Sequence, residues 1–359
     1  MGPQNFTDQG GPDEMPRARV HVIPTSSPDD VSGLQALVQE ERLDPARVVA
    51  VLGKTEGNGC VNDFTRAFAV SALKQTFEGT AENAALVMSG GTEGGLSPHL
   101  VIFEVLDETG SGPSMAIGAT ITRDLIPSEI GTFAQVECVA EAVGVAVRSA
   151  HIACSDDVHF VQIKCPLLTS ERIALSEDPT ATSDTLKSMG LSRGASALGV
   201  ALGLGEIDKD TAKRALADDD LSIWSGRASA SAGVELMNHE VLVLGMSASW
   251  CGPLTVDHAV MTDAIDLVPI RAAMERLKIY SETGLKAVFA KAEASSDGLI
   301  RGQRHTMLND SDISSTRHAR ALVGGVLAGL LERTDLFVSG GAEHQGPNGG
   351  GPVALIAEC

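Results

Sequence analysis

Three short patterns each occur three times along this chain of 359 residues, and always in the same order. The first is an apolar, strand-like run that ends in a lysine, the second is an arginine that opens a run of small residues, and the third is Ser-[Gly/Ala]-Gly-x-Glu. The repeated residues are the lysines Lys54, Lys164 and Lys291, the arginines Arg66, Arg193 and Arg320, and the serines Ser89, Ser231 and Ser339. The arginines are evenly spaced, because the step from 66 to 193 equals the step from 193 to 320. This regularity predicts an internal threefold repeat, in which packing of the units buries surface that one unit cannot bury alone.

Turn-rich segments at 107–113 and 251–253 separate the repeats, which we place at residues 16–107, 112–252 and 255–359. Within each repeat, short apolar runs rich in β-branched residues alternate with helix-like segments. We therefore predict an α+β fold of three similar repeats around a pseudo-threefold axis, with a β-barrel-like core and outer helices. Residues 1–15 are polar and contain several Gly and Pro residues, which predicts a disordered N-terminal extension.

The individual elements are predicted from the same patterns. The predicted strands are 48–54, 84–89, 100–106, 115–121, 159–164, 240–245, 285–291, 335–339 and 353–357. The predicted helices are 29–42, 62–77, 130–149, 193–205, 269–280 and 316–333. The strand before the serine motif is plain in the first and third copies, and less clear in the second.

Composition narrows the class of function. The 47 acidic residues outnumber the 27 basic ones, and the net charge of -20 argues against nucleic acid or an anionic membrane as a partner. A small anionic substrate can still enter a local basic pocket. The six cysteines include no C-x-x-C pair, which is typical of reduced thiols in a cytoplasmic enzyme. There is also no secretion signal and no long apolar run, so we expect a cytoplasmic location.

Burial and nearby charges can change the pKa of a lysine that lies at the end of an apolar strand. One such lysine would more often be a solvated strand end, but three equivalent lysines are expected to meet near one axis. Burial and mutual repulsion both lower the pKa of an ammonium group. A neutral lysine can then act as a general base or activate a serine.

The serine and arginine motifs suggest complementary roles. A serine hydroxyl can attack a carbonyl when a base lies beside it, and the N–H groups of the following turn can hold an oxyanion. The forked donors of arginine suit a planar, carbonyl-rich ligand. Each motif alone also fits a plain alternative, a turn or cap for the serine and a surface ion pair for the arginine. The glutamates four residues after the serines are expected to pair with the lysines or brace the loops; they are Glu93, Glu235 and Glu343.

Motifs for cofactors are scarce. The histidines show neither of the zinc-binding patterns H-x-x-x-H and H-E-x-x-H. The glycine-rich segments match neither a P-loop nor a dinucleotide fingerprint, so no organic cofactor is predicted. The loop at 342–352 has carbonyl groups that can wrap a hard cation, and Glu293 is a candidate acidic donor. A plain flexible loop is the simpler interpretation of these residues alone.

Several longer segments resemble the cyanuric acid hydrolase/barbiturase family of ring-opening amidohydrolases. They are GKTEGNGCVNDFTR, MSGGTEGG, RASASAGVE, residues 291–325 and VSGGAEHQGPNGGGP, and the resemblance runs from about Arg17 onward. The resemblance implies a threefold-repeat α+β barrel, often a homotetramer, in which each repeat gives one Lys, one Arg and one Ser to a central site.

The resemblance also implies roles for particular residues. Lys54, Lys164 and Lys291 would be the site lysines, and Arg66, Arg193 and Arg320 would hold the carbonyl oxygens of the substrate. Ser89-Gly90, Ser231-Ala232 and Ser339-Gly340 would contact the edge of its ring. The family's nucleophile pair is the middle one, so Lys164 and Ser231 are the implied catalytic residues, with Ser225 and Ser229 close by in the same serine-rich segment. A structural divalent cation, usually Mg²⁺, is implied at Glu293, Ala342, Gln345, Gly346, Pro347 and Gly350.

The resulting hypothesis is a hydrolase that opens the ring of a small planar cyclic imide. A threefold-symmetric ring suits a threefold site, so cyanuric acid is the first candidate and barbituric acid is the alternative. A non-catalytic binding protein for cyclic imides or small anions, and a structural threefold scaffold, are the alternatives from other classes.

Overall fold

Three four-stranded sheets form the centre of the molecule in the computed structural model, which describes residues 14–279 and 284–358. The first sheet contains β1 (Glu14–Pro24), β4 (His99–Thr109), β2 (Val48–Thr55) and β3 (Ala85–Gly90), in that spatial order. The second contains β5 (Ser114–Ile121), β8 (Glu240–Ser247), β6 (Val158–Pro166) and β7 (Ala228–Gly233). The third contains β9 (Leu254–Met261), β14 (Gly351–Glu358), β10 (Leu285–Ala292) and β13 (Phe337–Gly340).

The three sheets share one topology. In each, the fourth strand of the repeat pairs antiparallel with the first and second strands, and the second and third strands pair in parallel. An equal strand order and equal strand directions in three consecutive segments mean that three similar folding units follow one another along the chain. A short hairpin of β11 (Leu299–Ile300) and β12 (Gln303–Arg304) lies outside these sheets.

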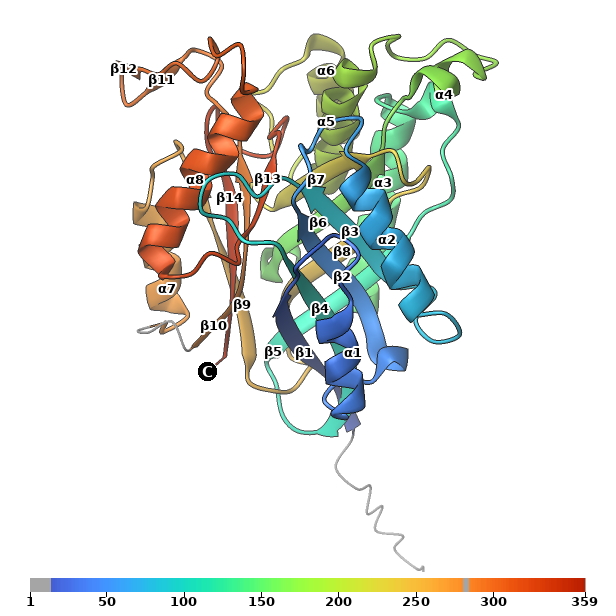
Figure 1. Ribbon diagram of the computed structural model, residues 1–359, viewed down its shortest axis with the longest axis vertical. Helices are drawn as coiled ribbons and strands as arrows, with labels where there is room; N and C mark the ends of the chain where they lie inside the picture. Colours follow the sequence, from blue (N-terminus) through green and yellow to red (C-terminus); the bar gives the residue numbers. More distant parts are fainter. Residues whose placement is uncertain (1–13, 280–283, 359) are drawn as a thin grey trace, which may run out of the picture.

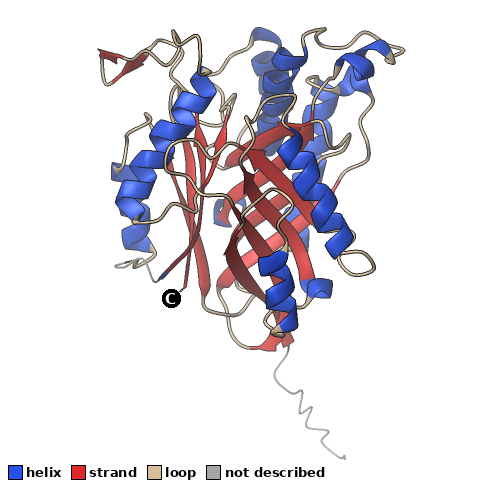
Figure 2. Ribbon diagram, viewed as in Figure 1, coloured by secondary structure: helices blue, strands red, loops and turns tan. Residues whose placement is uncertain are grey.

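Helices lie on the outside of the strands (Figures 1 and 2). They are α1 (Ser32–Gln39), α2 (Phe64–Thr76), α3 (Phe133–Ser149), α4 (Ser170–Ala174), α5 (Thr185–Gly203), α6 (Lys209–Asp218), α7 (Val268–Arg276) and α8 (Ser315–Leu331), with short 3₁₀ turns at Pro45–Arg47, Pro127–Glu129 and Ser155–Asp157. The helix that carries the motif arginine lies between the second and third strands of each repeat, and it is α2, α5 or α8. Side chains of Asp63, Asp184 and Ser314 accept hydrogen bonds from backbone N–H groups of the first turns, so each of these helices begins at a polar cap.

One core fills the space between the sheets. Four phenylalanines with no exposed surface meet there, one from the first sheet, one from the second and two from the third. The Phe289 ring centroid lies 6.1 Å from that of Phe103, 5.4 Å from that of Phe160 and 5.9 Å from that of Phe337. Since aromatic residues are only 3% of the chain, this cluster is a concentrated source of apolar contact between the units.

The α+β class is confirmed, whereas a closed barrel is not found. In residues 14–279 and 284–358, no strand of one sheet joins the ladder of another sheet, and side chains make the contact between sheets. The β-barrel-like core that the sequence suggested is therefore not confirmed, because twelve strands of the described residues lie in three separate four-stranded sheets. No helix in this described part is long and apolar enough to cross a membrane.

Several element boundaries differ from the prediction. Strand β1 begins at Glu14, so the last two residues of the expected disordered extension are paired with β4, while residues 1–13 lie outside the described part. Helix α5 begins at Thr185, eight residues before the predicted start at Arg193, because the side chain of Asp184 caps it there. The prediction missed β1 and β9, whose charged residues interrupt the apolar pattern, and it missed β7, which consists of small residues. It also missed the β11–β12 hairpin and the helices α4 and α6.

Candidate active site

Each motif lysine lies directly opposite its motif serine on two parallel strands. Lys54 pairs in register with Ser89, Lys164 with Ser231, and Lys291 with Ser339. Parallel strands end at the same edge of a sheet, so each pair projects from the same end of its unit. This register is the physical reason why the lysine and serine motifs recur together.

Lysine ammonium groups connect the three units in a ring. Lys54 Nζ donates to the carbonyl of Val338 at 2.8 Å, in the third unit. Lys164 Nζ donates to the carbonyl of Met88 at 2.6 Å, in the first unit, and Lys291 Nζ donates to the carbonyl of Ala230 at 2.8 Å, in the second. Each acceptor immediately precedes a motif serine, so every lysine supports the serine strand of another unit.

The arginines connect the units in the opposite direction. Arg193 pairs with Glu343, with N–O distances of 2.8 and 2.6 Å, and Arg320 pairs with Glu93 at 2.8 and 2.5 Å. Arg66 donates to the carbonyl of Ala232 at 3.1 Å. The glutamate of the serine motif therefore orients an arginine from another unit in two of the three sets.

The middle set breaks this symmetry. Its glutamate, Glu235, lies 2.7 Å from Lys164 Nζ and 3.9 Å from Arg66 Nε, so it pairs mainly with the lysine. Lys54 and Lys291 donate to their own serines at 3.3 and 3.2 Å, but Lys164 makes no hydrogen bond to Ser231.

The serine of the middle set has a different partner. Ser231 Oγ lies 2.8 Å from Ser339 Oγ, so two motif serines of different units meet. Lys164, which forms an ion pair with a glutamate, therefore differs from Lys54 and Lys291, which donate hydrogen bonds to serines.

Burial makes the lysines weaker bases than usual. It lowers the pKa of Lys54 well below its ordinary value, and the nearby charge of Arg320 acts in the same direction. Burial also lowers the pKa of Lys291, to about 7, and that of Lys164, where Glu235 partly opposes the shift. Lysines with lowered pKa values can be neutral at lower pH than free lysine, which is the form that accepts a proton.

One small pocket joins the remaining motif residues. Its lining consists of Arg66, Ser89, Gly90, Arg193, Ser231, Ala232, Arg320, Ser339 and Gly340, together with Gly59 and Met189. Apart from the three lysines, all nine residues predicted to contact the substrate therefore surround one small space. The lysines bond to the serine strands that form this lining. Sequence reasoning missed Gly59, which lies in a quoted family segment, and Met189, for which no motif existed.

The pocket opens toward a wider cavity. The two spaces share five lining residues, so two of the motif arginines lie where the spaces adjoin; the shared residues are Gly59, Met189, Arg193, Arg320 and Gly340. Of the serines considered as alternatives, Ser225 and Ser229 are buried and do not line the pocket, whereas Ser231 does.

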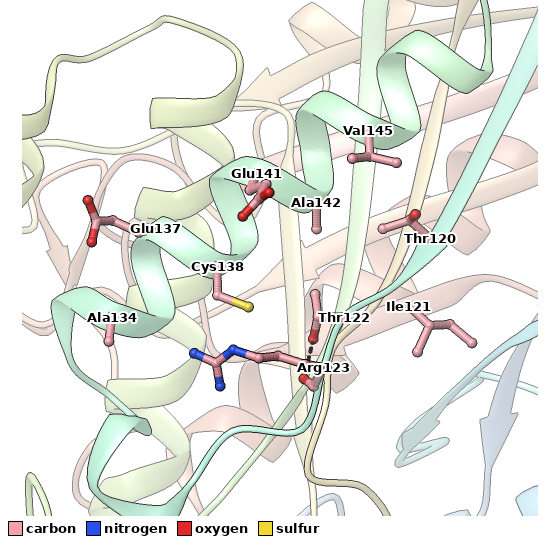
Figure 3. Close-up of a pocket in the computed structure, with 10 residues that line it drawn as sticks. All are labelled: Thr120, Ile121, Thr122, Arg123, Ala134, Glu137, Cys138, Glu141, Ala142 and Val145. Carbon is pink, nitrogen blue, oxygen red and sulfur yellow. Dashed lines mark hydrogen bonds between the residues drawn. The ribbon is translucent and has the colours of Figure 1, made fainter.

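A separate pocket lies on the outside of the second unit, between β5 and α3 (Figure 3). Its lining includes Thr122, Arg123, Cys138 and Glu141. The guanidinium of Arg123 is held by Glu129 at 2.7 Å, outside the pocket lining. None of the lysine, arginine or serine motif residues lies here, so this surface is distinct from the candidate active site.

The predicted cation ligands lie partly together. Glu293, Ala342, Gly346 and Pro347 line one pocket. The side chain of Gln345 is occupied elsewhere, since its Oε1 accepts from Ala230 N at 2.6 Å, and only its backbone carbonyl is left as a donor. The N–H of Gly350 donates to the carbonyl of Pro347 at 2.9 Å, which closes the loop.

Glu293 fits a site for a hard cation. Within the described residues no Lys, Arg or His forms an ion pair with its carboxylate, and burial together with the charge of Glu343 raises its pKa. A cation beside this carboxylate would offset both effects. The nearby donors are oxygens, the type that Mg²⁺ and Ca²⁺ prefer.

Comparison with known proteins identifies the family of the chain. The model of the amidohydrolase ring-opening protein family matches residues 19–358. The cyanuric acid amidohydrolase of Azorhizobium caulinodans is 55% identical over 353 residues, which cover 96% of this chain and 99% of that protein. The cyanuric acid amidohydrolase of Rhizobium johnstonii is 56% identical over 351 residues, with coverage of 96% and 99%.

Solved structures show the same fold. The crystal structure of the cyanuric acid hydrolase from A. caulinodans superposes with a TM-score of 0.92 at 54% identity, and it covers 96% of this chain and 99% of the other. A second cyanuric acid hydrolase, described as an evolutionary innovation by structural concatenation, gives a TM-score of 0.92 at 47% identity, with coverage of 96% and 100%. Concatenation agrees with three units of one topology. The chain therefore belongs to the family of amidohydrolase ring-opening proteins and is a cyclic amide hydrolase.

Proposed function

We propose that this enzyme opens the ring of cyanuric acid to carboxybiuret, which then loses CO₂ to give biuret. The observation that carries the proposal is the pocket in which three Ser and three Arg residues of three equal units converge. Cyanuric acid has threefold symmetry, so each of its carbonyl groups can meet one serine turn and one arginine. The relatives that are more than half identical carry the same activity in their names.

In the proposed mechanism, Ser231 is the nucleophile and neutral Lys164 is the base. The lysine accepts the hydroxyl proton while Oγ attacks a ring carbonyl carbon, and arginines and backbone N–H groups stabilise the oxyanion. The ring C–N bond then breaks, and the protonated lysine returns the proton to the leaving nitrogen. Water hydrolyses the acyl-enzyme and releases the ring-opened acid.

The choice of the middle pair rests on the asymmetry of the site as well as on the resemblance. Of the three site lysines in the described residues, only Lys164 forms an ion pair with a motif glutamate, and Glu235 can stabilise this lysine after it has accepted a proton. Lys164 and Ser231 are register partners on adjacent strands, although they are not hydrogen-bonded in this structure. Contacts of this kind often tighten only when substrate is bound.

Serine-to-alanine variants test this assignment, with initial loss of ring absorbance and formation of biuret as readouts. Ser231→Ala is expected to lower kcat by about 10⁴-fold or more, as removal of a nucleophile does. Ser89→Ala and Ser339→Ala remove one hydrogen-bonding group each, so each should cost about 10- to 100-fold. An equal loss in all three variants, or a larger loss in Ser89→Ala or Ser339→Ala, would contradict the middle serine as nucleophile.

The same assay tests the substrate. Wild-type enzyme should consume cyanuric acid and leave barbituric acid, which has a CH₂ group in place of one ring N–H. Turnover of barbituric acid alone would keep the site and replace the substrate by the alternative. Inactivity toward both rings would contradict the proposed reaction.

Two further properties are proposed from the family resemblance. A Mg²⁺ ion is expected at Glu293 and the carbonyls of the 342–350 loop, where it would fix the loop beside the third serine turn. The fit of a partly buried carboxylate and several carbonyl oxygens supports this site. A homotetramer is also expected, and light scattering of the purified enzyme checks it.

A further inference from the structure

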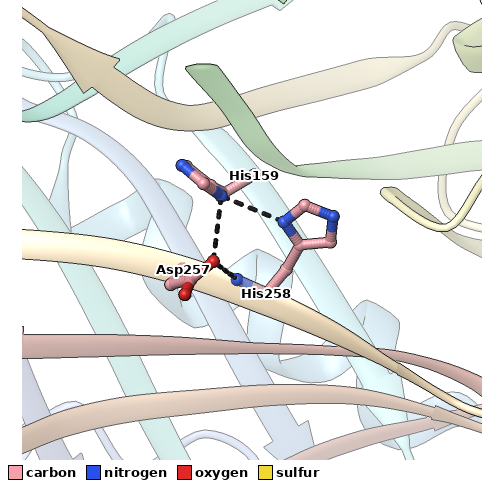
Figure 4. Close-up of side chains that lie close together, drawn as sticks. All are labelled: His159, Asp257 and His258. Carbon is pink, nitrogen blue, oxygen red and sulfur yellow. Dashed lines mark hydrogen bonds and ion pairs between the residues drawn. The ribbon is translucent and has the colours of Figure 1, made fainter. Parts of the chain in front are cut away.

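A cluster of metal-binding side chains lies away from the active site. His159 belongs to β6 of the second sheet, whereas Asp257 and His258 belong to β9 at the edge of the third (Figure 4). One potential ligand atom from each of the three residues lies within 4.8 Å of the others. His159 precedes Lys164 by five residues on one strand, which separates the cluster from the lysine by about 16 Å.

The distances approach those of a tetrahedral site. His159 Nδ1 lies 3.0 Å from His258 Nδ1 and 3.4 Å from Asp257 Oδ1. Zinc binds imidazole nitrogen and carboxylate oxygen at about 2.0–2.2 Å, so tetrahedral ligands stand about 3.3 Å apart. The two measured distances lie on either side of that value, and small rotations of the rings would bring a cation into contact with all three atoms.

The two close contacts of His159 Nδ1 compete for one proton. A single proton on His159 Nδ1 can point toward His258 or toward Asp257, but it cannot form a good hydrogen bond to both. A divalent cation would accept electron pairs from both imidazoles and from the carboxylate at once. Two imidazoles and one carboxylate also form the ligand set of known three-ligand zinc sites, which keep a water molecule in the fourth position.

The surroundings are suited to holding these ligands. Arg276 Nε donates to Asp257 Oδ2 at 2.5 Å, and the backbone N–H of His258 donates to Asp257 Oδ1 at 2.7 Å, so the carboxylate orientation is fixed. The side chains of His159 and Asp257 are 18% and 13% exposed, which leaves a path for a cation and a water molecule. Burial lowers the pKa of both histidines, that of His258 to about 4, so both are in the neutral form that binds a metal.

Nearby charges act in both directions. Arg227 and Arg276 lower the pKa of both histidines and would oppose a cation, while Asp257 raises both pKa values and would attract one. The ion pair between Asp257 and Arg276 leaves Oδ1 directed toward the histidines. A strongly coordinating metal is needed to bind here, and imidazole ligands select Zn²⁺ or a neighbouring transition metal over Mg²⁺.

We propose that His159, Asp257 and His258 form a transition-metal site, with Zn²⁺ as the first candidate, that fastens the second sheet to the third. The site is separate from the oxygen-lined loop at Glu293, because the ligands and the preferred cation differ. Metal binding would cross-link two repeats through side chains, at a contact where no strand pairing joins the described parts of their sheets. Its role is stabilisation of the fold rather than a step in ring opening.

The test is a Zn²⁺ titration of metal-stripped enzyme by calorimetry, with excess Mg²⁺ present to fill the loop at Glu293. Wild-type enzyme should bind one equivalent of Zn²⁺ per chain and should melt at a higher temperature when Zn²⁺ is present. His258→Gln should lose both effects. His318→Gln is the matched control, since His318 also pairs with a carboxylate, Asp310 at 2.9 Å, but has no second histidine there.

Anomalous diffraction at the zinc edge locates the ion in wild-type crystals, and this measurement does not depend on how a variant folds. A peak between His159, Asp257 and His258 is the expected result. Zn²⁺ binding that is equal in wild-type enzyme and a folded His258→Gln variant would overturn the proposal, as would the absence of a peak in crystals grown with Zn²⁺. The cluster would then be a hydrogen-bonded contact between sheets only.

Discussion

Replacing Phe289 by alanine tests whether the three units share one cooperative core. The Phe289 side chain has no exposed surface and stacks or tilts against three other phenylalanine rings from all three sheets. Loss of burial alone removes about 2–3 kcal/mol of stabilisation. The cavity and the lost ring contacts add to this, and the expected cost is about 4 kcal/mol, within the range of 3–5 kcal/mol for a buried Phe→Ala change.

The assay is equilibrium unfolding in urea at one fixed enzyme concentration, followed by circular dichroism and by tryptophan fluorescence. Phe64→Ala is the control, because Phe64 is 74% exposed and its replacement should change the free energy of unfolding by less than about 0.5 kcal/mol. Both variants should unfold in a single transition that coincides for the two probes.

Two results would refute this reasoning. A loss below about 1.5 kcal/mol for Phe289→Ala would mean that the rings contribute little to the contact between sheets. Separate transitions for the two probes in wild-type enzyme would mean that the units unfold independently, in spite of the core that they share.

Three other changes separate the roles of the site residues. Glu235→Gln removes the negative charge that raises the pKa of Lys164, so this pKa should fall further. The acidic limb of the plot of kcat against pH should then move to lower pH, and an unmoved limb would contradict Lys164 as the base. Glu93→Gln leaves Arg320, 4% exposed, without its carboxylate and should cost about 3 kcal/mol in urea unfolding, while an unchanged midpoint would contradict a structural ion pair. Glu293→Gln should abolish the rise in melting temperature that Mg²⁺ gives the wild-type enzyme, and a rise that persists would place the ion elsewhere.

Several features followed from the sequence because they are encoded by local pattern. The repeat was visible in the order and spacing of lysine, arginine and serine motifs, and the apolar runs before Lys54, Lys164 and Lys291 are strands as predicted. Caps at Asp63 and Ser314 begin two helices close to the predicted starts. Strands such as β1, where charged residues alternate with apolar ones at the edge of a sheet, escaped detection because one face carries the polar side chains.

Other features exist only in the folded molecule. Glu235 and Glu343 occupy the same place in their motifs, yet one lies beside Lys164 and the other holds Arg193, and no local pattern distinguishes them. The separation of the strands into three sheets rather than a closed barrel also depends on contacts between units. The sequence therefore determined which residues recur and where each strand ends, since those properties depend on near neighbours. Tertiary packing alone decided which unit each lysine, arginine and glutamate reaches, because these contacts join residues that lie between 61 and 284 positions apart in the sequence.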